Sequence, residues 1–119
     1  MDSSFSTEFH TLKGYQMHSE SDLTEAMEDY LEMIGRCMQE NGYVRVNALA
    51  NKLHVRPSSV SKMVNKLREL DLVQFEKYGL ITTTEKGYDE AQYLLWRHEV
   101  LLRFFRRLNG EDDQLTLVE

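Results

Sequence analysis

Two short segments with apolar residues at helical spacing, joined by a turn of three residues, constrain the fold of this chain most. The first segment spans residues 47–53 and the second runs from Pro57 to about Leu70, with His54-Val55-Arg56 between them. Asn47 can cap the first helix, and Pro57 can begin the second, because the first amides of a helix have no partner within it. The side chains expected to face inward on the second helix are Val60, Met63, Val64 and Leu67. Two short helices around a tight turn form the helix-turn-helix pattern.

A pair of short runs with β propensity follows the second helix. Residues 72–76 and 80–83 are rich in β-branched and aromatic side chains, and Lys77-Tyr78-Gly79 connects them. A connection that contains glycine suits a hairpin. Because a hairpin directly after the second helix of this pattern is a wing, the sequence predicts a winged helix-turn-helix.

Longer helices are predicted on both sides of this unit. The first runs from Thr24 to a stop at Asn41-Gly42, and residues 43–46 form a short extended piece. The last helix begins after Thr84 and ends at Asn109-Gly110. Since it is longer and more apolar than a wing needs, we expect it to cover the core at one end and to meet a partner chain at the other.

The predicted fold is therefore mainly α with a small β-hairpin. We expect a flexible N-terminal arm at residues 1–22, a winged helix-turn-helix domain at 23–84, and the start of a dimerisation region at 85–119. Gly87 lies in the first turn of the last helix, where we expect it to be tolerated.

The composition is typical of a soluble globular protein. Of 119 residues, 41% are hydrophobic and 29% are charged, and no run approaches the ~20 apolar residues of a membrane span. The first residues lack the apolar core of a signal peptide. The single cysteine, Cys37, cannot form a disulfide within the chain. We therefore expect a cytoplasmic protein with no membrane partner.

The net charge of −6 alone argues against a nucleic-acid partner, but the distribution of the charges along the chain does not. Residues 51–88 carry 7 basic and 4 acidic side chains, whereas both flanks are acidic. DNA responds to the local field of the surface that meets it, so a basic middle between acidic flanks is compatible with DNA binding. Chance alone can also produce such an asymmetry.

The helix from Pro57 is the predicted recognition helix, which would lie in the major groove of double-stranded DNA. Small hydroxyl residues near its start allow close approach to phosphates, and long basic residues can reach base edges or phosphates. The candidate DNA-binding residues are Arg56, Pro57, Ser58, Ser59, Ser61, Lys62, Asn65, Lys66 and, in the wing, Lys77. The alternative is that the serines only cap the helix and the lysines only form a solvated face.

Two carboxylates on the first helix form a candidate metal site. Asp29 and Glu32 are three residues apart and share one helix face. With a distant histidine such as His98 they would give oxygen and imidazole donors, which suit Mn, Fe or Zn. The alternative is an ordinary solvated acidic face and a histidine satisfied by another partner.

Enzymatic functions find little support in the sequence. It contains no glycine-rich loop that would cradle a phosphate and no serine or cysteine motif of a nucleophile. We therefore expect no enzymatic activity.

Several motifs in order resemble one family, the manganese- and iron-dependent repressors, also called the diphtheria-toxin-repressor-like family. The likeness extends over residues 23–110. It is carried by TEAMEDYLE at 24–32, VRPSSVSKMV at 55–64, FEKY at 75–78, LITTTEKG at 80–87 and WRHE at 96–99.

The resemblance is strongest to the manganese-responsive branch, and it implies a set of metal ligands. Asp29, Glu32 and His98 match the ligand positions of that branch, and Glu119 matches the next one. Asp29 supplies oxygen where iron-responsive relatives carry methionine, which implies Mn2+, with Fe2+ and Zn2+ as alternatives. The remaining ligands and most of the dimerisation region would follow residue 119, so the resemblance implies an incomplete metal-binding and dimerisation region at 85–119.

The resemblance implies a repressor that binds operator DNA as a homodimer when metal fixes the spacing of its two recognition helices. Two other hypotheses remain open. The chain could be a winged-helix regulator that does not depend on metal, or a protein-interaction module that uses the long apolar helix and has lost DNA contact.

Overall fold

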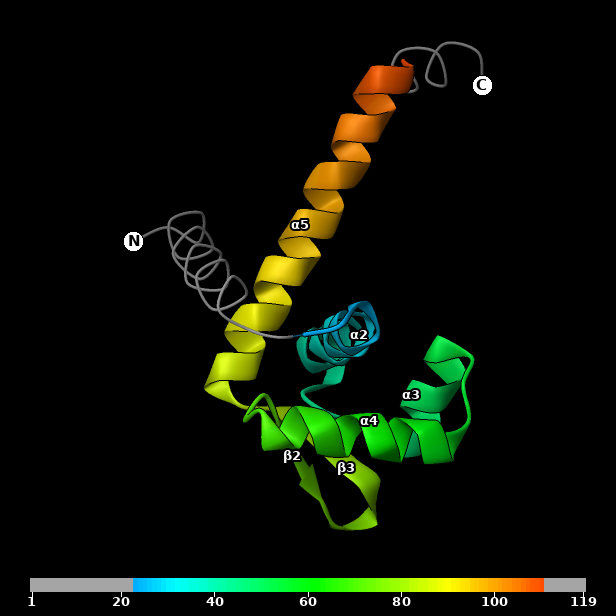
Figure 1. Cartoon of the computed structure of the whole chain (residues 1–119), viewed down its shortest axis with the longest axis vertical. Coiled ribbons are helices and arrows are strands. Elements are labelled where there is room, and N and C mark those ends of the chain that lie inside the picture. The colour runs from blue at the N-terminus through cyan, green and yellow to red at the C-terminus, as the bar shows by residue number, and fades with distance from the viewer. Residues whose placement is uncertain (1–22, 111–119) are drawn as a thin grey trace.

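A computed structural model describes residues 23–110 (Figure 1), so the predicted arm at 1–22 and the candidate ligand Glu119 lie outside the described residues. The helices and strands follow in the order α2 Glu25–Asn41, β1 Val44–Arg45, α3 Val46–Leu53, α4 Pro57–Glu69, β2 Val73–Glu76, the 3-10 turn η1 Lys77–Gly79, β3 Leu80–Thr83 and α5 Glu85–Asn109. The predicted fold class is confirmed: the domain is a winged helix-turn-helix, mainly α, followed by a long helix.

Helix α2 begins and ends where the sequence predicts. The side-chain oxygen of Thr24 accepts a hydrogen bond from the backbone amide of Met27 at 3.1 Å. At the other end Gly42 adopts a left-handed conformation with φ 82°, which suits a residue without Cβ. The inner face of the helix buries Tyr30, Leu31, Ile34 and Cys37.

Helix α3 begins earlier than expected, and the prediction that Asn47 caps it is wrong. The residue before the helix is Arg45, which makes no side-chain cap, and Asn47 lies within the first turn. The reason is a contact distant in sequence: Val44 and Arg45 pair with Ile81 and Leu80 of β3 and are held extended up to the helix start. The turn after α3 passes through His54 in a left-handed conformation, and Pro57 is the first residue of α4, as predicted.

The hairpin belongs to an antiparallel sheet of three strands in the order β1-β3-β2. Ile81 of β3 pairs with Val44 on one side and with Phe75 on the other. The sequence predicted the hairpin and the extended piece at 43–46, but not that the two would pair. The connection η1 passes through Tyr78 and Gly79, both with positive φ, and forms the tip of the wing.

The long helix α5 is capped by Thr84, whose hydroxyl accepts a hydrogen bond from the amide of Gly87 at 2.9 Å. Gly87 is more than tolerated, because a Cβ at this position would overlap the carbonyl oxygen of Leu72. A second glycine allows α2 and α5 to approach each other closely, because a Cβ on Gly35 of α2 would lie 2.7 Å from the Cβ of Ala91 on α5. The absence of a side chain at Gly35 and Gly87 therefore allows α5 to pack closely against the domain.

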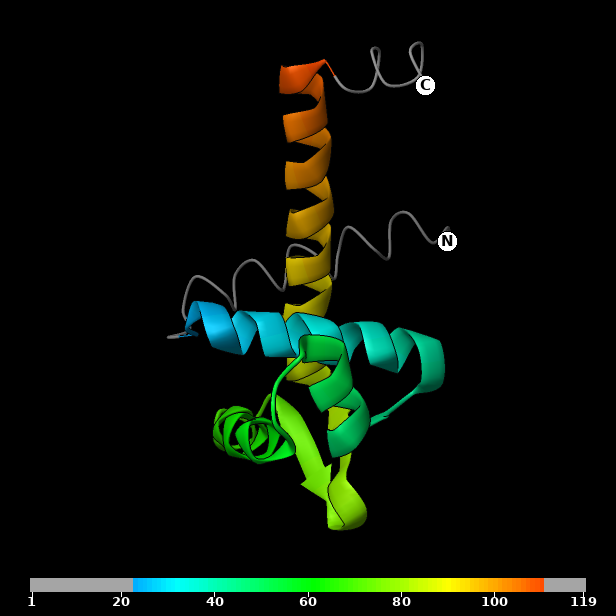
Figure 2. The ribbon, with the colours of Figure 1, turned by 90° about the vertical axis from the view of Figure 1, so that its right-hand side faces the viewer.

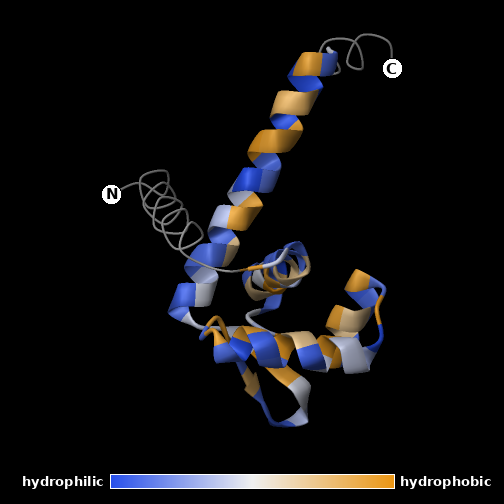
Figure 3. Cartoon of the chain, in the orientation of Figure 1, coloured by the Kyte–Doolittle hydropathy of each residue, from blue (hydrophilic) through white to orange (hydrophobic). Residues whose placement is uncertain are grey.

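The core lies between α2, α3, α4, the sheet and the first half of α5. Its fully buried side chains include Leu31, Ile34, Leu49, Val64, Leu67, Ile81 and Leu94. Figure 2 shows α2 running across α5 near the start of that helix, whereas the second half of α5 projects away from the domain. Figure 3 shows apolar residues continuing along this projecting half. None of the helices between residues 23 and 110 combines the length and the apolar character needed to cross a membrane.

Candidate nucleic-acid interface and metal site

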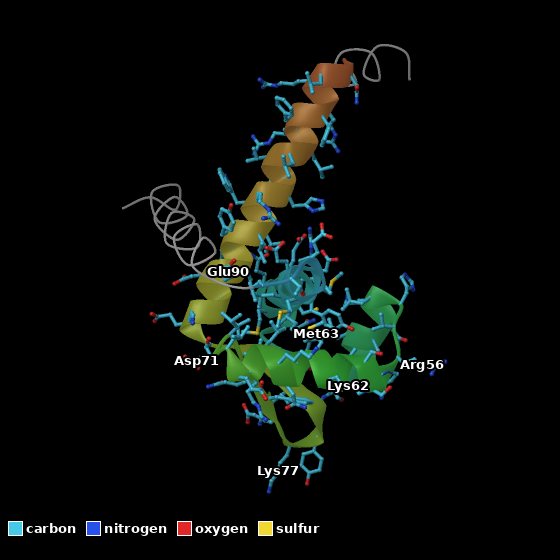
Figure 4. All side chains as sticks on the ribbon, viewed as in Figure 1. Arg56, Lys62, Met63, Asp71, Lys77 and Glu90 are labelled. Carbon is cyan, nitrogen blue, oxygen red and sulfur yellow. The ribbon has the colours of Figure 1, made fainter. Side chains whose placement is uncertain are left out.

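Helix α4 has one face in the core and one face open to solvent. Val60, Val64 and Leu67 are completely buried. On the other side Lys62 is exposed, and Figure 4 shows it on the opposite side of α4 from Met63, which lies toward α2. This division follows from helical spacing, since residues three and four apart share a face.

The predicted DNA-binding residues divide into two groups by exposure. Ser61 and Asn65 are half-buried, and the amide of Asn65 donates a hydrogen bond to the backbone oxygen of Ser61 at 3.0 Å. This bond orients Asn65 along the helix. The exposed members are Arg56, Pro57, Ser58, Ser59, Lys62, Lys66 and Lys77. Ser61 is therefore only partly accessible to a ligand, whereas the basic side chains of the exposed group project into solvent.

Two further residues lie in or beside the wing, Tyr78 at its tip and Arg45 in the neighbouring strand β1. Tyr78 is 91% exposed, and its backbone oxygen accepts a hydrogen bond from Arg45 at 3.1 Å. Arg45 also lies 5.9 Å from the ring of Tyr43. Tyr78 has a positive φ of 64° within the turn. A bulky residue before the glycine of a predicted hairpin turn was the available signal for Tyr78, but nothing local marks Arg45.

The exposed side of α4 and the wing is basic. Figure 4 shows Arg56, Lys62 and Lys77 on the side of the molecule away from the projecting half of α5. The first turn of α4 contains no acidic residue, so the positive end of the helix dipole is not neutralised there. This surface can attract phosphates, and its small serines leave room for a duplex to approach.

The second candidate site lies where α2 meets α5. The Nδ1 atom of His98 lies 3.4 Å from Oε2 of Glu32, although the two residues are far apart in sequence. The same oxygen accepts a hydrogen bond from Arg36 at 3.2 Å. The side chain of Glu32 is only 18% exposed, whereas those of Arg36 and His98 are about half exposed.

An ion pair also ties these two helices together. Arg97 donates to Glu28 at 3.0 Å and lies over the ring of Tyr93, 5.8 Å from its centre. Burial lowers the pKa of Arg97, but the hydrogen bond and charge of Glu28 outweigh burial and raise this pKa above its usual range. The guanidinium therefore stays charged, and α2 and α5 are linked by an ion pair beside the Glu32–His98 pair.

Two of the four predicted metal ligands are brought together. Asp29 is exposed and lies one helical turn before Glu32. No group of three or more His, Cys, Asp or Glu side chains able to hold a metal forms within residues 23–110, so Asp29 does not join Glu32 and His98 in this arrangement. Glu119 lies outside the described residues.

The Glu32–His98 pair is compatible with a divalent cation. Two ligand atoms that are each about 2.1 Å from one ion lie roughly 3.0–3.5 Å apart at the usual coordination angles. The observed separation of 3.4 Å falls within this range. A carboxylate oxygen and an imidazole nitrogen are donors that Mn, Fe and Zn accept.

The chain is similar in sequence to known transcriptional regulators. The family model for the iron dependent repressor, N-terminal DNA binding domain, matches residues 22–81. The HTH-type transcriptional regulator MntR of Shouchella clausii is 46% identical over 90 residues, covering 76% of this chain and 62% of that protein. MntR of Bacillus subtilis is 40% identical over 92 residues, covering 77% of this chain and 65% of that protein. The chain spans less than two thirds of the length of these curated relatives.

Solved structures give the same architecture. The crystal structure of IdeR from T. acidophilum has a TM-score of 0.51 and 30% identity, covering 60% of this chain and 32% of that chain. Wild-type ZitR of Lactococcus lactis has a TM-score of 0.64 and 25% identity, covering 76% of this chain and 61% of that chain.

Proposed function

This chain belongs to the iron-dependent repressor family, and on that premise we propose that it is a metal-dependent transcriptional repressor that binds operator DNA. The observation that carries the proposal is the exposed basic face of α4 with the wing beside it (Figure 4), in a domain 40–46% identical to MntR regulators. Because such a regulator acts on DNA, we assign it to the cytoplasm.

We assign distinct roles to the DNA-facing residues. Lys62 and Arg56 are long enough to reach base edges or phosphates once α4 enters the major groove. Ser58, Ser59 and Ser61 allow close approach of the helix, and their hydroxyl groups can meet phosphates. The wing, with Lys77 and Tyr78, would follow the adjacent backbone and fix the register of the helix on the duplex.

We propose Mn2+ as the effector, held by Glu32 and His98 together with Asp29 and Glu119, with Fe2+ and Zn2+ as alternatives. The set would contain three carboxylates and one imidazole, and oxygen donors favour the harder Mn2+. When bound, the ion would supply a positive charge that both α2 and α5 share. Glu32 and His98 contribute by standing 3.4 Å apart on two different helices, so that a ligand to both would stabilise their junction.

We propose that metal controls DNA binding through the junction between α2 and α5. Helix α5 carries exposed apolar residues along its projecting half, and we propose that these meet a second copy in a homodimer. Fixing α2 against α5 would then fix the recognition helix relative to its dimer mate, and so the spacing between two half-sites. The chain would exist in a DNA-competent arrangement of the two helices and in others that do not fit the operator. The population of the DNA-competent arrangement rises with metal only if the metal binds that arrangement more tightly.

The test measures DNA affinity against metal. A fluorescent duplex selected from a random pool with Mn2+ present is titrated with the full chain by anisotropy, once with Mn2+ and once with excess chelator. We expect at least ten-fold tighter binding with Mn2+, a coupling typical of allosteric effectors. Full-strength binding in chelator would overturn the gating proposal.

One observation favours a second candidate, a regulator with the same fold that does not need metal. The Glu28–Arg97 ion pair and a hydrogen bond between Gln39 and Gln92 at 3.1 Å already join α2 to α5. The double substitution Asp29→Ala with Glu32→Ala separates the two candidates. Loss of the Mn2+ response supports gating, whereas unchanged affinity for the duplex at every metal concentration supports the second candidate.

A further inference from the structure

The Glu32 carboxylate carries two partners on one oxygen atom. His98 lies 3.4 Å and Arg36 lies 3.2 Å from the same Oε2 of Glu32. Arg36 is four residues after Glu32 on α2, so its side chain reaches back along its own helix. A cation from the chain itself therefore stands at the oxygen that we assign to the metal.

A guanidinium and a divalent cation compete for such an oxygen. Both are attracted to the carboxylate, and they repel each other because both are positive. An ion that takes the lone pair used by the guanidinium would displace it from Oε2, and the positive charge that stays nearby would still oppose the ion. This effect distinguishes Arg36 from a neutral residue of similar length.

The structure gives Arg36 the freedom to move. Its side chain is 47% exposed, in contrast to the 18% of Glu32. Beside it lies a cavity of about 440 Å³ between α2 and α5, lined by Arg36, Gln92, Trp96 and His98 among others. The guanidinium can withdraw into this solvated space, so the competition weakens metal binding without preventing it.

We propose that Arg36 is a competitor built into the metal site, which raises the concentration of divalent cation needed to join Glu32 and His98. The inference rests on the proposed function, since it presumes that Glu32 is a metal ligand. Arg36 acts through Glu32 and is a positioning residue, not a ligand. The sensitivity of the regulator would then be set by a side chain outside its ligand set.

The test compares metal affinity in four proteins, the natural chain and three variants of it. Binding of Mn2+ is measured by the loss of the electron paramagnetic resonance signal of the free ion, and independently by the emission of Trp96, the only tryptophan of the chain. The variants are Arg36→Met, which keeps length and removes charge, Arg36→Lys, which keeps charge, and Arg103→Met. Arg103 is the matched control, because it also pairs with a glutamate four residues away, at 3.4 Å, but on the projecting half of α5.

We expect Arg36→Met to bind Mn2+ roughly three- to ten-fold more tightly than the natural chain, since one positive charge near a dication has been removed from a partly solvated site. Arg36→Lys and Arg103→Met should stay within about two-fold of the natural chain, because neither removes a charge at the site. Equal or weaker binding by Arg36→Met, or an equal gain in Arg103→Met, would overturn the inference.

A fifth protein separates this inference from the proposed function. Glu32→Gln keeps the size of the side chain and removes its charge. If Glu32→Gln loses Mn2+ affinity while Arg36→Met gains none, Arg36 is not a competitor but the metal site stands. If Glu32→Gln binds Mn2+ as tightly as the natural chain, the site proposal itself is wrong, and the role of Arg36 falls with it.

Discussion

The two halves of α5 belong to one continuous helix but have opposite surroundings. In the first half Gly87, Ala91 and Leu94 are buried against the domain. In the second half every residue from 101 to 109 is exposed, including large apolar side chains such as Phe104, Phe105 and Leu108. The apolar spacing continues across both halves, so periodicity predicts which side of the helix is apolar but not what covers it. The first half is covered by its own chain, and we propose that the second is covered by another copy.

The largest contrast between the halves is expected in stability. Leu94 is 1% exposed and Leu108 is 65% exposed. Leu94→Ala leaves a cavity in the core and should lower the free energy of unfolding by about 2–5 kcal/mol. Leu108→Ala removes no buried contact within the chain and should change it by less than about 0.5 kcal/mol. Urea unfolding at low protein concentration, followed by circular dichroism, measures both.

The outcome for Leu108 also tests the proposed dimer. Sedimentation velocity on the same variant should show weaker self-association than in the natural chain, while the chain remains folded. Equal losses of stability in both variants at low concentration would contradict the comparison, since they would mean that the projecting half is packed within a single chain.

A second contrast concerns DNA. Lys62 lies on the exposed face of α4, whereas Arg106 lies on the projecting half of α5. Lys62→Glu should weaken duplex binding by more than about ten-fold, or about 1.4 kcal/mol, and flatten the salt dependence, because phosphate contacts are lost. Arg106→Glu makes the same change in net charge. On a duplex that carries a single half-site, to which one protomer binds without the proposed dimer contact, it should alter the affinity by less than about two-fold if DNA meets only the winged domain.

Anisotropy titrations at several salt concentrations measure this second contrast. Equal effects of the two substitutions would indicate that DNA responds to total charge and not to the α4 face. The proposed recognition surface would then be wrong.

The parts of the fold that the sequence predicted depend on local signals. Thr24, Pro57 and Thr84 begin their helices and Gly42 and Gly110 end theirs as expected, because a cap acts on amides or carbonyls within one turn of itself. The apolar face of α4 was predicted from another local signal, the spacing of three and four residues between its apolar side chains. Caps and apolar spacing can be recognised within a few turns of the chain, whereas the burial of an apolar face requires the elements that pack against it.

The parts that the sequence missed depend on contacts between distant residues. The start of α3 was misplaced because β1 pairs with β3, more than thirty residues later. The importance of Gly87 comes from its contact with Leu72. The Glu32–Arg36 pair is an exception, because its spacing of four residues on one helix is a local signal that the sequence already contained. Spacing placed Asp29 and Glu32 on one face, but it could not predict that only Glu32 would reach α5 in this arrangement.

The smallest contrast concerns backbone strain. Among the described residues, the non-glycine residues with positive φ are His54, Asp71 and Tyr78, all of them in the winged domain and none in the projecting half of α5. Asp71 has φ 62° at the junction between α4 and β2, where its backbone oxygen accepts a hydrogen bond from Thr84 at 2.7 Å. Packing around the start of α5 thus holds an L-residue in a conformation that only glycine adopts freely.

Replacing Asp71 tests whether the domain carries this strain. Its side chain is exposed, and the hydrogen bond to Thr84 uses the backbone, so Asp71→Gly keeps that bond. We expect a gain of about 0.5 kcal/mol, which corresponds to a midpoint about 2–4 °C higher, because relief of the left-handed conformation slightly exceeds the greater entropy of glycine in the unfolded chain. Asp71→Ala should lose about 0.5–1 kcal/mol, since alanine lacks the local hydrogen bonding that lets aspartate tolerate this region. A thermal melt that ranks alanine above glycine would mean that φ is not what limits this position, and that the junction holding α5 to the domain is free of strain like the half that projects from it.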